Sequence, residues 1–317
     1  MNTWQLPEGI DELSGDQAMK FEMLRRSLID LYTDKGFGLV IPPMVEHVDS
    51  LLLTSDAVNE KTFKFLDPVS GKMLGVHADI TPQIARIDAK RNSNKVEKYC
   101  YINAILQTRA DDFYDSRSPI QAGAELYGST DTLADVEVIE LMLESLNLLA
   151  IDSTVISLGN VAIFDALITS ETLNIVQTNE LRHIFAHRST PDLSVFMGSN
   201  TLNNAALFNA LMQLEGDASV LSKALDIFKD FPAAQVAIKD LQAIDQALQA
   251  KGIQASYDLA ELQTYEYHTG IVFSAYNEHY SKALAQGGRY NGIGESFGQS
   301  RAATGFSFDL KFLSQSK

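Results

Sequence analysis

Helical spacing of apolar residues is the first regular pattern along the chain. Residues 16–35 repeat apolar side chains every three to four positions, which is typical of an amphipathic helix. Ser14 and Asp16 are candidate caps at its start, and Gly36 is the expected stop. The side chains that share one face are Phe21, Leu24, Leu28 and Leu31. Further helices are predicted over 81–91, 132–150, 217–231 and 236–252.

Strand-like stretches alternate with these helices in the first half of the chain. FGLVIPP (37–43) predicts a strand that ends at two prolines. Residues 60–78 predict a hairpin that turns at 67–71, and residues 98–128 predict a longer one. A further strand is expected at 153–161. After Gly252 strand patterns resume in four segments: YDLAEL, YHTGIVFSAYN, YSKALAQGGRYNGI and RAATGFSFDLKFL.

These patterns predict an α+β protein with a mostly antiparallel sheet flanked by helices. Residues 165–255 are rich in Leu, Ala, Asn, Gln and Asp at helical spacing, with few β-branched runs. We therefore expect residues 1–164 and 256–317 to form one core fold. The segment 165–255 is then expected to be an all-helical insertion domain.

Composition narrows the class of protein. The 317 residues are 45% hydrophobic, enough for a sizeable core, and no apolar run approaches the roughly 20 residues that span a membrane. The single cysteine excludes a disulfide framework and fits a reducing cytoplasm, and the first residues show no signal-peptide pattern. The net charge of −16 disfavours nucleic acid and anionic membranes as partners.

The stretch QAGAELYG (121–128) is the best candidate for binding chemistry. Side chains alternate faces on a strand, so Gln121, Gly123 and Glu125 share one face. Asp79 and Thr81 add a carboxylate and a hydroxyl where a strand passes into a helix. Such groups suit an ammonium-bearing ligand. The alternative from spacing alone is a row of solvated polar residues at a sheet edge.

Other motifs give weaker signals. QGGRYNGIG (286–294) lacks the spacing of known phosphate loops, and its glycines suggest a turn with positive φ. His183 and His187 lie four apart on a predicted helix, but no third metal ligand is evident. Cys100 has no evident partner base. The residues alone therefore predict no catalytic set, no metal and no cofactor.

Five segments in order resemble the catalytic core of histidyl-tRNA synthetase, a class II synthetase. GFGLVIPPMVEHVDSLL resembles the dimer-forming first motif, and HADITPQIARIDA resembles the pocket segment that reads Arg-Pro-Glu-Gly-Thr there. KYCYINAILQTR and PIQAGAELYG resemble the second motif and the strand after it. YEYHTGIVFSAY resembles the histidine-specific segment, and GGRYNG with GFSFDLKFL the third motif. The similarity covers nearly the whole chain.

Departures from the synthetase pattern fall on the side that handles ATP. The resemblance implies an Arg-x-Glu in the second motif, where this chain has Gln107 and Arg109. The arginine that opens the histidine-specific segment is Gln263, and the arginine that ends the third motif is Phe312, after Lys311. One lost electrostatic contact to a transition state costs roughly 2.7–4 kcal/mol. Three lost cations predict that this chain does not form histidyl-adenylate.

The amino-acid side of the pattern is better kept. By resemblance, Glu125 and Gln121 hold the amino group of histidine, while the paired aromatic position that is tyrosine in the synthetase is His268. The chain also ends soon after the third motif, so we expect no anticodon-binding domain and no tRNA partner. The full set that the resemblance assigns to histidine binding is Asp79, Thr81, Arg117, Gln121, Glu125, Tyr267, His268 and Tyr290.

A synthetase-like chain that keeps the amino-acid pocket but lacks the catalytic cations resembles the family of ATP phosphoribosyltransferase regulatory subunits. The tetrads Leu-Gln-Thr-Arg and Tyr-His-Thr-Gly look like versions from that family. The resemblance implies a partner, the short-form catalytic subunit, in a hetero-octamer with four subunits of each kind. It also implies activation of that subunit, feedback inhibition by L-histidine in the first step of histidine biosynthesis, and a homodimer through the first-motif region. The alternatives are a synthetase-like enzyme that forms histidyl-adenylate and a stand-alone histidine-binding module.

Overall fold

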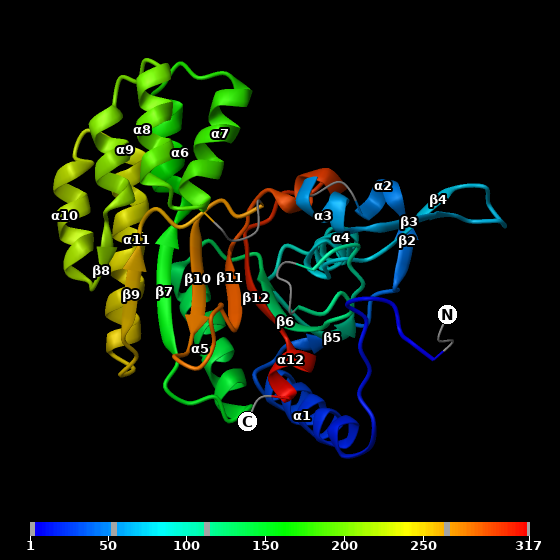
Figure 1. Ribbon diagram of the computed structural model, residues 1–317. Helices are drawn as coiled ribbons and strands as arrows, with labels where there is room; N and C mark the ends of the chain where they lie inside the picture. The colour runs from blue at the N-terminus through cyan, green and yellow to red at the C-terminus, as the bar shows by residue number, and fades with distance from the viewer. Residues whose placement is uncertain (1–3, 52–55, 111–114, 263–266, 316–317) are drawn as a thin grey trace. The chain divides into compact units, whose positions relative to one another are not determined.

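The computed structural model describes residues 4–51, 56–110, 115–262 and 267–315 and divides the chain into two compact units (Figure 1). The first unit comprises residues 1–129, 141–152 and 292–317, and the second comprises residues 130–140 and 153–291. Helix α5 (Thr132–Leu148) contributes to both units. Among the helices of the described residues, none is long and apolar enough to cross a membrane.

The first unit carries a sheet run in the order β1-β5-β6-β12 and a separate three-stranded sheet in the order β2-β4-β3. All pairs are antiparallel except β1 with β5. The elements of this unit are α1 (Gly15–Asp34), β1 (Gly38–Leu39), β2 (Val45–His47), α2 (Val48–Leu51), α3 (Asp56–Lys61), β3 (Phe63–Leu66), β4 (Met73–Val76), α4 (Thr81–Arg91), β5 (Glu97–Ala104), β6 (Ile120–Tyr127), the 3-10 helix η1 (Ile293–Phe297), β12 (Ala303–Asp309) and α12 (Leu310–Ser314).

Helices α1 and α12 contact each other and pack on β5 and β6 (Figure 1). Leu28 and Tyr32 of α1 are fully buried, and the Tyr32 ring meets that of Phe306 edge-on, with centroids 6.3 Å apart. The predicted helical face of 16–35 is thus the face that covers the sheet. Ser14 takes the predicted N-cap position, but its side chain makes no capping bond.

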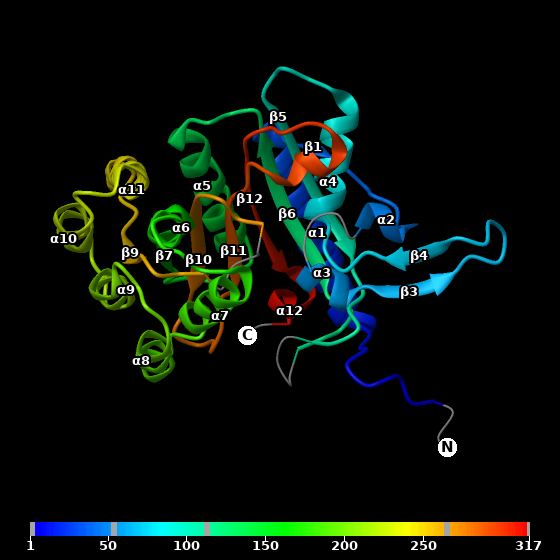
Figure 2. The same cartoon turned by 90° about the horizontal axis from the view of Figure 1, so that it is seen from above.

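The second unit carries strands in the order β11-β10-β7-β9-β8, antiparallel except for β7 with β9. Helices α8, α9, α10 and α11 follow one another in an arc (Figure 2). The elements are β7 (Val155–Asn160), α6 (Val161–Thr169), α7 (Ile175–Ala186), α8 (Thr190–Ser199), α9 (Ala205–Met212), β8 (Glu215–Gly216), α10 (Ser219–Ile227), α11 (Pro232–Gln249), β9 (Ala255–Asp258), β10 (Ile271–Tyr276) and β11 (Ala285–Arg289).

The segment 165–255 is helical, as its composition predicts, apart from the two-residue strand β8 and the first residue of β9. Phe185 and Phe208 of this segment pack with Phe164, the residue just before it, with ring centroids 4.8 to 6.3 Å apart. A capping box and a proline stabilise two of its helix starts: Asn174 and Gln177 bond reciprocally at the start of α7, and Pro232 begins α11. The segment's standing as a separate domain stays a prediction.

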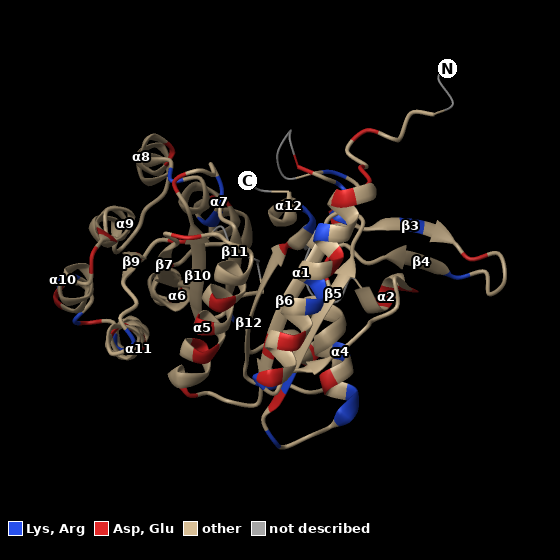
Figure 3. Ribbon diagram, turned by 90° about the horizontal axis from the view of Figure 1, so that it is seen from below, with Lys and Arg blue, Asp and Glu red and all other residues tan. Residues whose placement is uncertain are grey.

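Acidic and basic residues are distributed unevenly over the ribbon. Figure 3 shows acidic positions along α1 and α5 and basic positions at the end of α4, where Lys90 and Arg91 close the helix. Arg91 lies 3.6 Å from the carboxylate of Glu97 and over the ring of Tyr99. Positive side chains at a helix C-terminus are stabilised by the helix dipole, which accounts for their place there.

Candidate functional site

Strand β6 carries the predicted binding residues in the middle of the first unit's sheet run. It pairs with β5 on one side and β12 on the other, so it is not an edge strand. Gln121 is 5% exposed and Glu125 is 1% exposed. The alternative of solvated polar residues at a sheet edge is therefore wrong. Burying such groups costs free energy unless hydrogen bonds compensate them, so their partners decide the chemistry.

Gln121 joins the start of α4 to the sheet. Its Nε2 donates to Asp79 Oδ1 at 2.9 Å and to Ser307 Oγ at 3.1 Å. Its Oε1 accepts from the backbone N–H of Ile80 at 2.9 Å. Asp79 Oδ1 also accepts from the backbone N–H of Thr81, at 3.3 Å. The amide thus fixes the position of one carboxylate at the start of the helix.

Glu125 accepts hydrogen bonds from two hydroxyl groups. Thr81 Oγ1 donates to its Oε1 at 2.8 Å, and the Tyr101 hydroxyl donates to the same oxygen at 3.1 Å. Gly305 pairs with Glu125 across β12 and leaves room for the second carboxylate oxygen, Oε2, which a Cβ at this position would overlap. Gly123 leaves room for Tyr101 in the same way, since its Cβ would lie 2.6 Å from that hydroxyl.

The contacts of the first unit therefore bring together four of the five residues predicted there: Asp79, Thr81, Gln121 and Glu125. Sequence reasoning missed Tyr101 and Ser307, which complete the hydrogen bonds. Both face strand β6 because the register pairs Tyr101 with Gly123 and Gly123 with Ser307. Alternation along the flanking strands would have pointed to them once the pairing register was known.

Two carboxylates whose oxygens accept from hydroxyl, amide and backbone donors suit a cationic ligand group. Charge-assisted hydrogen bonds are roughly twice as strong as neutral ones, and low surrounding polarity strengthens them further. An ammonium or a protonated imidazole brings both the charge and the donors that such oxygens accept. The polar set is consistent with an amino-acid ligand.

Arg117 is the fifth predicted residue of the first unit. Its Nε donates to the backbone oxygen of Gln107 at 3.1 Å, and one terminal nitrogen donates to the backbone oxygen of Glu8 at 3.0 Å. Its guanidinium also lies 5.3 Å above the ring of Phe63. The side chain thus joins the second hairpin to the N-terminal segment, and its role toward a ligand stays a prediction.

The three residues predicted from the second unit form an aromatic cluster. The ring centroids of Tyr267 and His268 are 5.2 Å apart, and those of Tyr267 and Tyr290 are 5.5 Å apart. The three side chains are 1 to 8% exposed. Burial lowers the pKa of His268 to about 3, so its imidazole is neutral. Such a cluster suits a flat ring more than a charged group.

Close packing on a strand, not the predicted turn, accounts for Gly288, one of the glycines before Tyr290. Gly287 and Gly288 lie within β11 and neither has positive φ, so the predicted turn is wrong. A Cβ on Gly288 would lie 2.9 Å from two atoms of the His268 ring and 2.5 Å from the backbone oxygen of Ile271. The glycine therefore lets the imidazole pack directly on the strand.

In the hairpin between β5 and β6, Gln107 and Arg109 have partners within the chain. Gln107, which stands where the resemblance places an arginine, donates through its amide to the backbone oxygen of Ala78 at 3.1 Å. Arg109 pairs with the carboxylate of Glu60 at 2.5 Å, and both are largely exposed. Gln263, Asp111 and Asp112 lie outside the described residues.

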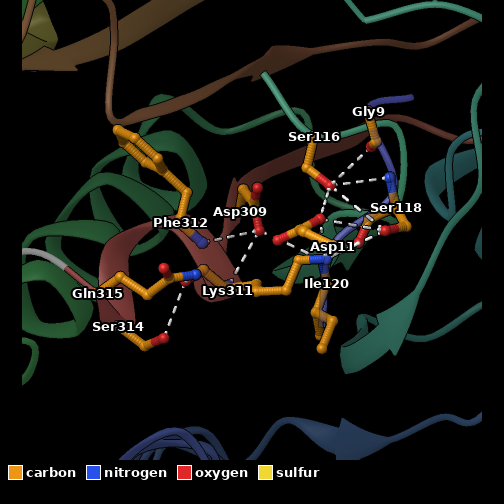
Figure 4. A network of polar contacts seen from close by, with 10 residues as sticks. All are labelled: Gly9, Asp11, Ser116, Ser118, Ile120, Asp309, Lys311, Phe312, Ser314 and Gln315. Atoms are coloured by element: carbon orange, nitrogen blue, oxygen red, sulfur yellow. Dashed lines mark hydrogen bonds and ion pairs between the residues drawn. The ribbon is translucent and has the colours of Figure 1, made fainter. Parts of the chain in front are cut away.

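Lys311 is the cation nearest to the end of the third motif, and it is buried in a network with the N-terminal segment (Figure 4). Its ammonium lies 2.8 Å from Asp11 Oδ1 and also donates to the backbone oxygen and the hydroxyl of Ser118. Ser116 donates to the same carboxylate. Burial raises the pKa of Asp11, but the bonds from Lys311 and the two serines outweigh this and lower it overall.

Asp309 anchors the same network from the start of α12. Its Oδ1 accepts from the backbone N–H groups of Lys311 and Phe312 and from that of Ile120, at 2.9 to 3.2 Å (Figure 4). The first two bonds cap the helix, and the third joins it to the first residue of β6. Burial raises the pKa of Asp309 despite these bonds. Phe312 itself is 36% exposed.

The histidine pair on α7 forms a local contact. The rings of His183 and His187 stack with centroids 4.0 Å apart, and His187 Nδ1 lies 2.9 Å from the backbone oxygen of His183. Among the described residues, no group of three or more His, Cys, Asp or Glu side chains is arranged to hold a metal ion. Cys100 is buried, and burial raises the pKa of its thiol to about 12.

Comparison with known proteins gives consistent matches over nearly the full chain. Residues 9–313 match the family model for histidyl-tRNA synthetase. The chain is 40% identical to an ATP phosphoribosyltransferase regulatory subunit of Thiobacillus denitrificans, over 99% of this chain and 98% of that protein. It is 40% identical to the regulatory subunit of Chromohalobacter salexigens, over 98% of this chain and 81% of that one.

Solved structures share the fold at lower identity. A protein of Bacillus halodurans described as an ATP phosphoribosyltransferase regulatory subunit/histidyl-tRNA synthetase superposes with a TM-score of 0.89 at 21% identity, covering 99% of this chain and 83% of that chain. Histidyl-tRNA synthetase from Nostoc gives a TM-score of 0.82 at 17% identity, covering 98% and 75%. The predicted α+β fold of class II synthetase type is confirmed.

Proposed function

This chain belongs to the family of ATP phosphoribosyltransferase regulatory subunits, and on that premise we propose that it is a non-catalytic regulator that binds histidine. It activates the short-form catalytic subunit of ATP phosphoribosyltransferase and transmits feedback inhibition by L-histidine. The observation that carries the proposal is a contrast within the first unit. The polar groups predicted to hold an amino acid are buried and ordered, while the cations on the predicted nucleotide side are bonded within the chain.

By resemblance, residues of each unit contribute to histidine binding. Asp79, Thr81, Gln121 and Glu125 supply carboxylate, hydroxyl and amide groups for the amino group of histidine. The cluster of Tyr267, His268 and Tyr290 supplies aromatic surface for its side chain. Arg117 stays in the proposed set by resemblance alone.

The absence of catalysis is proposed from the electrostatics of the hairpin and of α12. Phosphoryl and adenylyl transfer depend on cations that neutralise developing charge in the transition state. Gln107 has no charge, Lys311 faces Asp11, and Arg109 faces Glu60. Lys311, which is buried against Asp11, does not present its positive charge to a nucleotide.

The proposed assembly is a hetero-octamer of four regulatory and four catalytic subunits, with a homodimer through the first-motif region. Apolar exposure in that region supports the homodimer. The exposed apolar residues there are Leu39 (43%), Ile41 (77%), Met44 (49%) and Val45 (37%). Neighbouring exposed apolar side chains are typical of interfaces rather than of solvated surface.

Histidine acts in this proposal by changing the equilibrium between an active and an inhibited complex. Linkage then requires that the state of the catalytic subunit also change histidine affinity by the same factor. Glu125→Ala is expected to weaken feedback inhibition while activation of the catalytic subunit survives. Glu144→Ala, which removes a carboxylate 40% exposed in the same unit, is the matched control. Unchanged histidine inhibition in Glu125→Ala would exclude the assigned site.

Two further experiments separate this function from its alternatives. Robust histidine-dependent exchange of pyrophosphate into ATP by the isolated protein would mark it as a synthetase-like enzyme. Mixing with the short-form catalytic subunit on a sizing column tests the partner directly. Absence of co-elution, with histidine binding intact, would favour a stand-alone histidine-binding module.

A further inference from the structure

His77 is a fully buried imidazole between strand β4 and helix α4, two residues before Asp79. Both of its ring nitrogens have hydrogen-bond partners. Nδ1 lies 2.5 Å from Gln83 Oε1, and Nε2 lies 2.7 Å from the backbone oxygen of Ala104. The backbone carbonyl of Ala104 can only accept, so Nε2 must carry a proton. Whether Nδ1 donates or accepts depends on which atom of the Gln83 amide, oxygen or nitrogen, lies against it.

The orientation of the Gln83 amide follows from its remaining contacts. Its Nε2 donates to the backbone oxygen of Pro43 at 2.8 Å and to Glu46 Oε1 at 2.7 Å. Both partners are acceptors. A flipped amide would bring its oxygen against two other oxygens and would lose both bonds. Gln83 therefore presents its oxygen to His77 Nδ1, and that nitrogen must also donate.

We infer that His77 is held as an imidazolium that donates from both ring nitrogens and positions the segment that carries Asp79 and Thr81. A neutral imidazole has one donor and one acceptor nitrogen, so either neutral tautomer sets two lone pairs against each other in a buried place. Such a contact leaves a buried acceptor without a donor, which is unfavourable. The doubly protonated ring satisfies every partner.

A buried positive charge needs compensation, and the contacts supply it. Glu46 of β2 lies one hydrogen bond beyond Gln83 and is itself only 10% exposed in its side chain. It also pairs with Arg86 of α4, at 2.5 Å. Glu46 and Arg86 are thus linked to His77 through Gln83, and Asp79 lies two residues along the chain. The carboxylate of Glu46 is shared between one guanidinium and the chain of bonds that leads to the imidazolium.

The position of His77 links its protonation to the binding residues. Its backbone N–H donates to Met44 and its backbone oxygen accepts from Leu106, at 3.0 and 3.2 Å. With the ring bond to Ala104, these contacts hold the chain just before Asp79 against the first-motif segment and the second hairpin.

The spectroscopic test does not depend on the proposed function. In the full-length protein, the side-chain ¹⁵N resonances of His77 are expected to show both ring nitrogens protonated near neutral pH. The exposed His47, on the neighbouring strand β2, serves as the reference ring. A His77 spectrum with one unprotonated nitrogen at about pH 6 would overturn the inference.

The binding test rests on the proposed function, because it uses histidine as the ligand. His77→Arg keeps a permanent cation that only donates, and His77→Gln offers one donor and one acceptor. We compare the histidine affinity of the wild type with that of His77→Arg at each pH. The ratio of the two affinities is expected to fall roughly tenfold or more between about pH 6 and about pH 9, because the wild type loses a charged hydrogen bond. Parallel pH profiles for wild type and His77→Arg would overturn the positioning role.

Failure of the two proposals can be told apart. Histidine binding by none of these proteins would remove the proposed function, while the ¹⁵N signature would still decide the state of His77. If His77→Gln does not fold, the comparison of wild type with His77→Arg and the wild-type spectrum remain.

Discussion

Replacement of Gly305 by alanine tests whether the carboxylate of Glu125 must stay where the structure has it. Gly305 lies in β12 directly opposite Glu125 in β6. A Cβ there would overlap Glu125 Oε2 and would lie 2.5 Å from its Cδ and 2.8 Å from the backbone oxygen of Ala124. Glu125 is 1% exposed, so it has little room to move aside without breaking its own hydrogen bonds.

The magnitude follows from the bonds at risk. A displaced carboxylate loses the hydroxyl donors of Thr81 and Tyr101, at 2.8 and 3.1 Å. Hydrogen bonds to charged groups contribute about 1.5–3 kcal/mol each, so the variant is expected to be destabilised by about 3–6 kcal/mol if neither bond reforms. Loss of one charged contact to the ligand would lower histidine affinity by roughly tenfold to a hundredfold.

Two measurements on the same samples separate these effects. Urea unfolding gives the free energy of unfolding, and titration calorimetry gives the dissociation constant for histidine. Gly198→Ala is the matched control, because no heavy atom lies within 4 Å of a Cβ at that position in α8. The control should be unchanged in binding and slightly more stable, by about 0.5–1 kcal/mol.

A Gly305→Ala protein that folds as stably as the control and binds histidine as tightly as wild type would refute the reasoning. It would mean that Glu125 can leave its place without consequence. A protein that is destabilised yet binds histidine normally would show that Glu125 stabilises the fold but does not contact the ligand.

Three further predictions concern ionisable groups. Asp11→Asn should lower stability at neutral pH by about 1 kcal/mol, since the pair with Lys311 is partly exposed. Because the pKa of Asp11 is lowered, its contribution is present above about pH 4 and lost below, so acid unfolding of the variant should be less steep. His268, with its pKa lowered to about 3 by burial, should stay neutral in an NMR titration until the protein unfolds, and its neutral burial should weaken stability as the pH falls below about 6.5. Cys100, with its pKa raised to about 12 by burial, should react with a thiol reagent only after denaturation.

Local sequence signals predicted the helices better than the strands. The segment 81–91 forms α4 with the predicted bounds, because Pro82 suits the first turn and Asn92 adopts the left-handed conformation that ends a helix. The strand predicted at 37–43 is shorter, at Gly38–Leu39. The backbone N–H of Val40 still donates to the oxygen of Cys100 at 2.8 Å, but Pro42 and Pro43 cannot donate to a ladder, so the strand does not extend to them.

The candidate-site residues that lie on one strand could be predicted from the sequence. Those that join the site through the pairing register of neighbouring strands could not. The alternation of Gln121 and Glu125 is visible in the sequence. The hydroxyl of Tyr101 joins them only because β5 pairs with β6 in one register, which the sequence does not state. The roles of Gly288 and Gly305 likewise depend on which side chain lies across the strand, and a sequence pattern alone assigns such glycines to turns.

The difference between a synthetase and a regulator on this fold lies in where the positive charges are neutralised. Asp309 joins the start of α12 to Ile120, one residue before Gln121, so the network of Lys311 and Asp11 adjoins the strand that carries the proposed amino-acid site. A nucleotide on that side would have to displace Asp11 before Lys311 could meet a phosphate, and it would leave a carboxylate nearby. On the proposed amino-acid side, hydroxyl and amide groups donate to the carboxylates of Glu125 and Asp79, and a cationic ligand would add charge-assisted bonds to these. Ligand recognition can therefore outlast adenylation on the same sheet.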